Sequence, residues 1–230
     1  MSVRSLEIAD NLRSVQERIH LAAQQCKRSV DEITMVAVTK TYPASDVQIL
    51  KDLGVLNFGE NRDEEGREKS ASVPGIWHFQ GQIQSKKLGS IVSWANFIHS
   101  IDQASHLEKL ERALSSLPSK KALGIFLQLS LDGAPGRGGV LADDLERLAQ
   151  KALECPHITL MGLMCVPSVD RDANEAFAQV AQIHGQFLRN FPEARSLSMG
   201  MSGDFETAII HGATHIRVGS SILGSRTPAQ

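Results

Sequence analysis

The chain has 230 residues, of which 42% are hydrophobic and 22% charged, so it is long enough to bury a substantial core. Its 24 Lys and Arg residues nearly balance 26 Asp and Glu residues. The resulting formal net charge of −2 gives no basic field for nucleic acid or anionic lipid. An anionic ligand must therefore be held by local groups.

The sequence shows no targeting, membrane or disulfide pattern. No apolar run approaches the roughly 20 residues that span a bilayer, and the N-terminus lacks the hydrophobic stretch of a secretory signal. Cys26, Cys155 and Cys165 form neither a CxxC pair nor a disulfide framework. We therefore expect a cytoplasmic protein without a metal site, not a membrane, secreted or zinc-finger protein.

The chain begins with an amphipathic pattern over 5–28, where apolar residues including Leu6, Ile8, Leu12 and Leu21 predict a helix. Short apolar runs then alternate with longer helical patterns. Strands are predicted at 33–39, 55–59, 76–81, 95–101, 122–130, 158–164, 194–200 and 214–219. Helices are predicted between them at 45–53, 61–70, 103–116, 142–153 and 172–190.

This alternation predicts the fold class. Strands that are apolar on both faces and separated by helices are typical of a parallel sheet covered by helices. Eight such units predict a closed (β/α)₈ barrel, and an open doubly wound sheet is the alternative. No linker divides the chain, so residues 1–230 are expected to form one domain. In a barrel the ligand site lies where strands end and βα loops begin.

Polar residues follow the first three predicted strands. Lys40 ends the first; a lysine at a barrel mouth can be desolvated, which makes its amine a nucleophile towards a carbonyl. A solvated surface lysine is the alternative. The second strand leads into NFGENR and the third into WHFQGQ. His78 alternates with Trp77 and Phe79 and is predicted to point into the barrel, either as a hydrogen-bonded core histidine or as a general base.

Two Gly/Ser turns follow the last two strands. Ser202 with Gly203, and Gly219 with Ser220, are small residues that would let a phosphate approach backbone N–H groups. The loops after strands 7 and 8 of a barrel frequently form a phosphate site. These four residues are therefore candidates for a phosphate cup. The alternative is that Ser202 and Asp204 cap a helix and Gly219 only makes a turn.

A strand-end lysine with a phosphate cup points to an aldehyde that carries a phosphate, as bound by class I aldolases and pyridoxal 5′-phosphate (PLP) proteins. The sequence resembles the YggS/PROSC family of PLP homeostasis proteins from about residue 33 to 226. The motifs that carry the resemblance are VAVTKTYPASDV, NFGENRDEE, WHFQGQIQSKK, HSID, GLMCVPS, LSMGMSGDFETAI and HIRVGSSILGSR. The resemblance implies one fold-type III barrel similar to the N-terminal domain of alanine racemase.

The resemblance also implies roles for individual residues. Lys40 matches the lysine that holds PLP as a Schiff base, the internal aldimine. Arg217 matches the arginine beside the cofactor, at its phosphate or at its ring nitrogen. An arginine at the ring would keep the pyridine nitrogen unprotonated and weaken the cofactor as an electron sink. The other matched positions, in the phosphate cup and pocket lining, are Ser202, Gly203, Gly219, Ser220, Asn57, His78 and Met199.

The sequence departs from the family pattern in two places. Tyr42 and Arg137, the latter in a Gly-rich rim loop at 132–139, stand where many relatives have a lysine. Because of both changes, the chain is not expected to have the auxiliary lysine that would help to transfer the cofactor. The chain ends soon after the eighth predicted strand, without a counterpart of the β-domain of alanine racemase, so a monomer is expected. Two-base racemisation needs groups on both faces of the substrate, and only Lys40 is a candidate.

The function expected from the resemblance is PLP binding in intracellular PLP homeostasis, with an effect on amino- and keto-acid pools. Little or no catalysis and no catalytic residue are expected, and PLP-dependent apo-enzymes are the expected partners. A PLP-dependent amino-acid racemase is the first alternative. A class I aldolase that acts on a phosphorylated sugar is the second.

Overall fold

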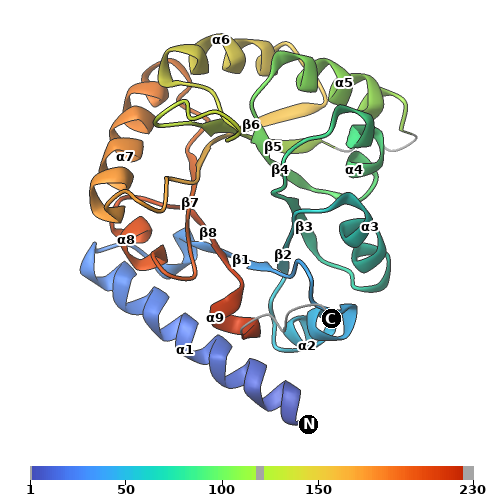
Figure 1. Ribbon diagram of the computed structural model, residues 1–230, viewed down its shortest axis with the longest axis vertical. Helices are drawn as coiled ribbons and strands as arrows, with labels where there is room; N and C mark the ends of the chain where they lie inside the picture. The colour runs from blue at the N-terminus through green and yellow to red at the C-terminus, as the bar shows by residue number, and fades with distance from the viewer. Residues whose placement is uncertain (1, 118–121, 225–230) are drawn as a thin grey trace.

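The computed structural model describes residues 2–117 and 122–224, which form a closed barrel of eight parallel strands in chain order (Figure 1). Strand β8 pairs with β1 and closes the sheet. The strands are β1 Thr34–Val38, β2 Asn57–Glu60, β3 Ile76–Phe79, β4 Phe97–Ile101, β5 Leu123–Leu129, β6 Ile158–Cys165, β7 Ser196–Met201 and β8 His215–Val218. The predicted (β/α)₈ barrel is confirmed, and the open doubly wound sheet is excluded.

The helices form a ring around the barrel (Figure 1). They are α1 Val3–Gln25, α2 Ala44–Asp52, α3 Asp63–Ser72, α4 Leu88–Trp94, α5 Ala104–Ser115, α6 Ala142–Leu153, α7 Ala173–Asn190, α8 Phe205–Ile210 and α9 Ser220–Leu223. Short 3₁₀ turns lie at Val30–Glu32 and Ser85–Lys87. Helix α4 was not predicted, because its seven residues LGSIVSW are too few to establish a helical period.

Helix α1 lies outside the ring, against α8 and α9 (Figure 1). Leu6 and Leu21 are 51% and 64% exposed, so the apolar positions predicted there do not belong to its packed face. Arg4 donates hydrogen bonds to Asp46 of α2 at 2.6 Å and to the carbonyl of Leu223 in α9 at 2.8 Å. The extra helix therefore links the helices that adjoin β1 and β8. Its packed face consists of Ile8, Leu12, Val15, Ile19, Ala22 and Ala23.

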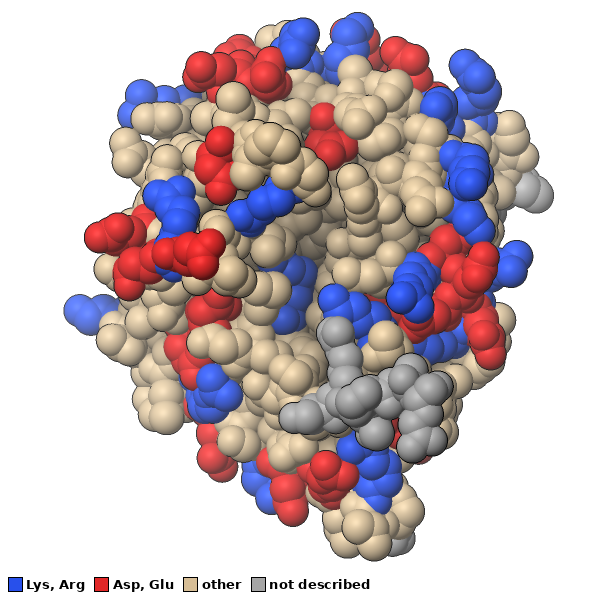
Figure 2. Space-filling model, in the orientation of Figure 1, with Lys and Arg blue, Asp and Glu red and all other residues tan. Residues whose placement is uncertain are grey.

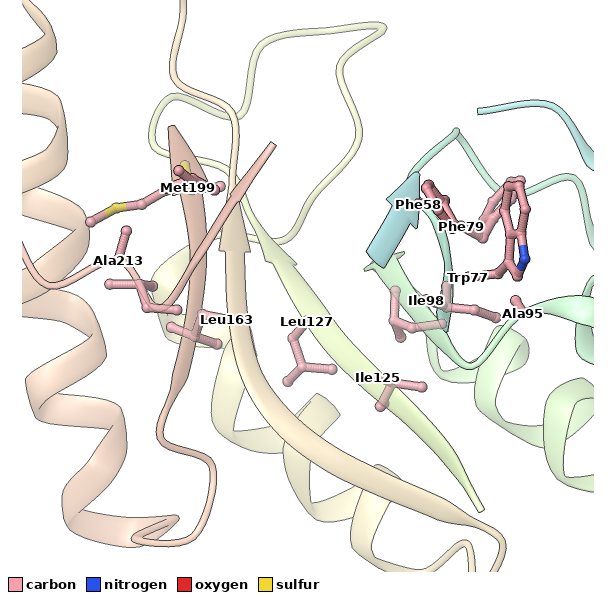
Figure 3. Packing of buried hydrophobic residues seen from close by; sticks show 14 of the residues in the cluster. Phe58, Trp77, Phe79, Ala95, Ile98, Ile125, Leu127, Leu163, Met199 and Ala213 are labelled. Atoms are coloured by element: carbon pink, nitrogen blue, oxygen red, sulfur yellow. The ribbon is translucent and has the colours of Figure 1, made fainter. Parts of the chain in front are cut away.

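Strand alternation divides the buried side chains into two layers. Trp77 and Phe79 belong to the apolar layer between strands and helices, which Figure 3 shows from close by. His78 lies between them in sequence, and its ring hydrogen-bonds instead to His99 of β4. The barrel interior thus carries polar side chains, although the strands read as apolar runs. These polar groups lead up to the mouth of the barrel.

Candidate functional site

A cavity of about 380 Å³ lies at the carboxyl ends of the strands, a size within the range of small-ligand sites. On the face seen in Figure 2 the molecule is hollowed at its centre, and Lys or Arg atoms are visible inside the hollow. The residues that line the cavity are Val38, Lys40, Asn61, Gln80, Met164, Val166, Met201, Ser202, Gly203, Arg217, Gly219 and Ser220. The candidate lysine, the arginine and both halves of the predicted cup therefore meet in one cavity.

The two Gly/Ser turns are joined by Ser202. Its Oγ accepts hydrogen bonds from the N–H groups of Gly219 at 3.1 Å and Ser221 at 3.4 Å. Ser221 Oγ donates in return to the Ser202 carbonyl at 3.2 Å. Asp204 accepts from the N–H of Met201 at 2.6 Å and does not cap α8 with its side chain. Ser202 thus bonds to the turn before α9 and not to α8, so neither Ser202 nor Asp204 caps α8 as the alternative expected, and the two turns form one unit at the cavity edge.

Gly200 lets the end of β7 bend so that the turn at Ser202 and Gly203 lies at the mouth of the barrel. Its φ of +89° lies in the left-handed region, and an added Cβ would lie 2.5 Å from Ala208 Cβ. The pairing of β7 with β8 shifts register between Ser198 and Met201, around this glycine. The strand therefore changes its course just before Ser202, because only glycine fits both the backbone angle and the space.

Arg217 lies on β8, is 6% exposed and still reaches the cavity wall. Its guanidinium donates to Ser198 Oγ at 2.7 Å and to the Cys165 carbonyl at 3.0 Å. Burial lowers the pKa of Arg217 to about 10, so it stays charged at neutral pH. The side chain extends towards β6, and these two bonds use two of its five N–H groups.

A buried chain of hydrogen bonds continues from Arg217 across the barrel. Ser198 Oγ lies 2.9 Å from His99 Nδ1. His99 Nε2 lies 2.9 Å from His78 Nδ1, and His78 Nε2 lies 3.0 Å from Asn57 Oδ1. Burial lowers the pKa of His78 to about 3 and that of His99 well below its ordinary value, so both rings are neutral.

The direction of this chain follows from its two ends. Arg217 can only donate, and the Asn57 side-chain oxygen can only accept. Both rings therefore donate from Nε2 and accept at Nδ1, and the Ser198 hydroxyl donates to the ring of His99. Every group in this chain of hydrogen bonds has a partner, and Ser198 at its end orients the guanidinium of Arg217.

The structure places three predicted site residues away from the cavity wall. Asn57 lies at the start of β2, not at its carboxyl end. His78 is fully buried between Asn57 and His99, which is the arrangement of a hydrogen-bonded core histidine. Met199 points from β7 towards the neighbouring helix (Figure 3) and belongs to the apolar layer.

Six lining residues were not among the predicted site residues, although two of them, Asn61 and Gln80, stand in the polar runs noted after the second and third strands. Asn61 and Gln80 directly follow β2 and β3, as Lys40 follows β1, so the strand-end rule applies to them equally. The Nε2 of Gln80 is buried and has no hydrogen-bond partner among the described residues. The other lining residues are apolar and gave no signal of a binding site in the sequence; they are Val38, Met164, Val166 and Met201.

The two positions where lysines are frequent in the family are occupied by side chains with local partners. The Tyr42 hydroxyl donates to the Gly224 carbonyl at 2.7 Å. Arg137 donates to the Val166 carbonyl at 2.6 Å and lies 3.5 Å from Asp132, so it ties two rim loops together. Across residues 2–117 and 122–224, no helix is long and apolar enough to cross a membrane, and no His, Cys, Asp and Glu side chains cluster as metal ligands.

The family model described as "Alanine racemase, N-terminal domain" matches residues 8–227. The chain belongs to this family. It is 38% identical to the pyridoxal phosphate homeostasis protein of Corynebacterium glutamicum, over 92% of this chain and 99% of that protein. It is 34% identical to the protein of the same name from Escherichia coli, over 96% and 97%. The resemblance read from the motifs is thus confirmed.

Solved structures agree with this family assignment. The structure of PipY from Synechococcus elongatus with PLP bound has a TM-score of 0.78 at 28% identity and covers 94% of this chain and all of that one. Alanine racemase from C. glutamicum has a TM-score of 0.72 at 14% identity, with 97% of this chain and 62% of the racemase covered. At that identity the likeness to the racemase shows the fold alone.

Proposed function

We propose that the chain binds PLP at the barrel mouth, with Lys40 as its covalent anchor, and serves in PLP homeostasis. The observation that carries the proposal is that one cavity joins Lys40, Arg217 and the two turns around Ser202 and Gly219. Relatives named for PLP homeostasis and a PLP-bound relative of similar structure support the same ligand.

The residues present fit this group. Among the described residues, no backbone acceptor is bonded to the N–H groups of Gly203 and Ser220, and both residues line the cavity. An added Cβ on Gly203 would meet nothing within 4 Å, so an anion can approach the backbone there. The buried, unpartnered Nε2 of Gln80 offers a further donor. When bound, PLP supplies an aldehyde carbon that condenses with an amine and a ring that withdraws electrons.

Each part of the site then has a task. The half-buried amine of Lys40 is the nucleophile, and Ser202 holds the two phosphate-binding turns together. Of the two roles open to Arg217, we propose the one at the ring nitrogen, and the bond from its guanidinium to the Cys165 carbonyl at the end of β6 supports this choice over the phosphate. A permanently charged donor there keeps the nitrogen unprotonated, which favours holding the cofactor over transamination.

The cavity wall favours a carrier over a racemase. Of the described residues that line it, only Lys40 and Arg217 are ionisable. Racemisation by two bases needs a second proton-transferring group on the opposite face of the substrate. Arg217 keeps its proton, and the hydroxyl of Tyr42 is bonded to the Gly224 carbonyl. The proposal therefore assigns little or no catalytic activity to this site.

We also propose a compartment, an oligomeric state and partners for the protein. On this proposal the protein is a cytoplasmic monomer, formed by one domain over residues 1–230, that supplies PLP to apo-enzymes. The three cysteines are unpaired, and a reducing compartment suits them. Size-exclusion chromatography with light scattering tests the monomer, and reconstitution of an apo-enzyme from the loaded protein tests the supply.

The decisive test of the site is borohydride reduction of the protein with PLP, followed by peptide mapping. The reduced adduct is expected on Lys40 and absent from Lys40→Ala, whereas the control Lys86→Ala should keep it. An adduct found chiefly on Lys86, Lys87 or another lysine refutes the assignment. If the protein racemises any amino acid at high concentration and Lys40→Ala abolishes this activity, the proposed carrier function is wrong and the racemase alternative is correct. Absence of any PLP adduct leaves the class I aldolase.

A further inference from the structure

The turn that carries Lys40 has a disfavoured backbone conformation. Thr41, the next residue, has a φ of +71°. Within the described part of the chain, Lys27 is the only other non-glycine residue with a positive φ. A β-branched residue in the left-handed region is a genuine outlier, and such conformations persist only where surrounding contacts hold them.

Beneath this turn lies a buried ion cluster of Glu60, Glu65 and Lys69, here called the Glu–Lys–Glu cluster. Lys69 Nζ lies 2.7 Å from Glu60 Oε1 and 3.1 Å from Glu65 Oε2. The side chains of Lys69 and Glu60 are 7% and 0% exposed, and that of Glu65 is 23% exposed. The cluster joins the end of β2 to the helix α3, next to β1.

The cluster binds the residue on each side of Lys40. Thr39 Oγ1 donates to Glu60 Oε1 at 2.6 Å, and the Thr39 carbonyl accepts from the ammonium of the cluster at 2.8 Å. The N–H of Thr41 donates to Glu65 Oε2 at 2.7 Å. Three atoms of the two residues that flank Lys40 are thus held by the cluster, while the Lys40 side chain lines the cavity.

The charge state of Glu65 suits this contact. Burial by itself would raise the pKa of Glu65, but the Thr41 N–H and Lys69 outweigh it and lower that pKa below its ordinary value. Glu65 is therefore an anion at neutral pH, and a hydrogen bond to an anion is stronger than one between neutral groups.

We propose that the Glu–Lys–Glu cluster is a positioning device that holds the strained turn at Thr41 and thereby aims the amine of Lys40 into the cavity. The inference deepens the proposed function and rests on it. A cluster that only stabilised the barrel would have no reason to bind both neighbours of the lysine, nor to hold a threonine in the left-handed region.

Glu65→Ala is the variant that tests the proposal, because removing Lys69 would leave Glu60 as a buried uncompensated charge and endanger folding. Two probes separate positioning from binding: PLP, and pyridoxine 5′-phosphate, whose alcohol cannot link to an amine. We expect Glu65→Ala to weaken PLP binding about tenfold, the effect of losing one hydrogen bond to a charged group. The affinity for pyridoxine 5′-phosphate should stay within about twofold of the wild-type value.

Matched variants sharpen the test. Glu68→Ala removes an exposed carboxylate from the same helix and should change neither affinity. Glu65→Gln keeps an oxygen acceptor for the Thr41 N–H and should restore most of the PLP affinity. Thr41→Gly combined with Glu65→Ala should recover PLP affinity several-fold over Glu65→Ala alone, because glycine adopts a positive φ without strain.

A readout without cofactor is hydrogen–deuterium exchange of the peptide that contains Thr41. Its N–H should exchange faster in Glu65→Ala than in the wild type or in Glu68→Ala. Equal losses of affinity for PLP and pyridoxine 5′-phosphate, or no loss for either, would overturn the positioning role. If the wild-type protein forms no adduct on Lys40, the proposed function fails instead, and the exchange result still reports on the cluster.

Discussion

Three neutral imidazoles inside the barrel make acid lability the sharpest physical prediction. The ring of His215 lies 6.3 Å from that of His78 and 6.2 Å from that of His99, measured between centroids. Burial lowers the pKa of His78 to about 3, that of His215 to about 4 and that of His99 well below its ordinary value. In the unfolded chain all three return to about 6.5.

The sign and size of the effect follow from linkage. Below pH 6.5 the unfolded chain binds more protons than the folded protein, so the free energy of unfolding falls as the pH falls. The contribution of the neutral histidines to that free energy is fully present above about pH 7. It is lost progressively as the pH falls towards their folded-state pKa values. At about 1.36 kcal/mol per pH unit, His78 and His215 each remove about 2 kcal/mol between pH 7 and pH 5. Together they remove about 4 kcal/mol, a large part of the stability of a typical domain, and His99 acts in the same direction.

Urea denaturation at pH 7 and pH 5 measures this loss. His215→Gln removes one titrating ring, so its loss between the two pH values should be smaller than that of the wild type by about 2 kcal/mol. The control Ile125→Val trims a fully buried side chain without a charge. It should lower stability by about 1 kcal/mol at both pH values and keep the wild-type pH dependence. If His215→Gln and the wild type lose the same free energy, His215 is not held neutral by burial and the reasoning is wrong.

Three further substitutions probe the site and the sheet. Arg217→Gln should weaken PLP binding about tenfold or more by equilibrium titration, and Arg217→Lys should not restore it, because the fork geometry is lost; unchanged affinity would make the arginine merely structural. Gly219→Val should weaken PLP far more than pyridoxal, because its Cβ would lie 3.1 Å from the Val38 carbonyl oxygen and displace the phosphate-binding turn; equal losses would indicate general damage. Gly162→Ala should lower the free energy of unfolding by at least about 3 kcal/mol, since its φ is +151° and a Cβ would lie 1.8 Å from the Ser196 carbonyl oxygen; near-wild-type stability in urea would contradict that contact.

Local sequence patterns were sufficient for the barrel and for part of its mouth. Strands buried on both faces need continuous apolar runs, and helices outside need a 3.6-residue period, so both leave a one-dimensional record. Lys40 and the turns around Ser202 and Gly219 could be found because strand ends can be located along the chain, and the barrel makes those ends converge. The same rule marks the polar runs after β2 and β3, but it does not tell which of their side chains, among them Asn61 and Gln80, line the cavity.

Contacts across the barrel could not be read in this way. His78 meets Asn57 of β2 and His99 of β4, and His99 meets Ser198, which is 99 residues further along the chain. A histidine carries the same local pattern whether it serves as a base or as a buried donor, and only its partners distinguish the two. The Glu–Lys–Glu cluster likewise joins Thr39, which directly follows β1, to β2 and α3. The sequence by itself determined where the chain ends its strands, because buried strands and the helices that cover them leave distinct apolar patterns along it. The tertiary structure decided which side chains face the cavity, because barrel closure and strand register bring distant residues together.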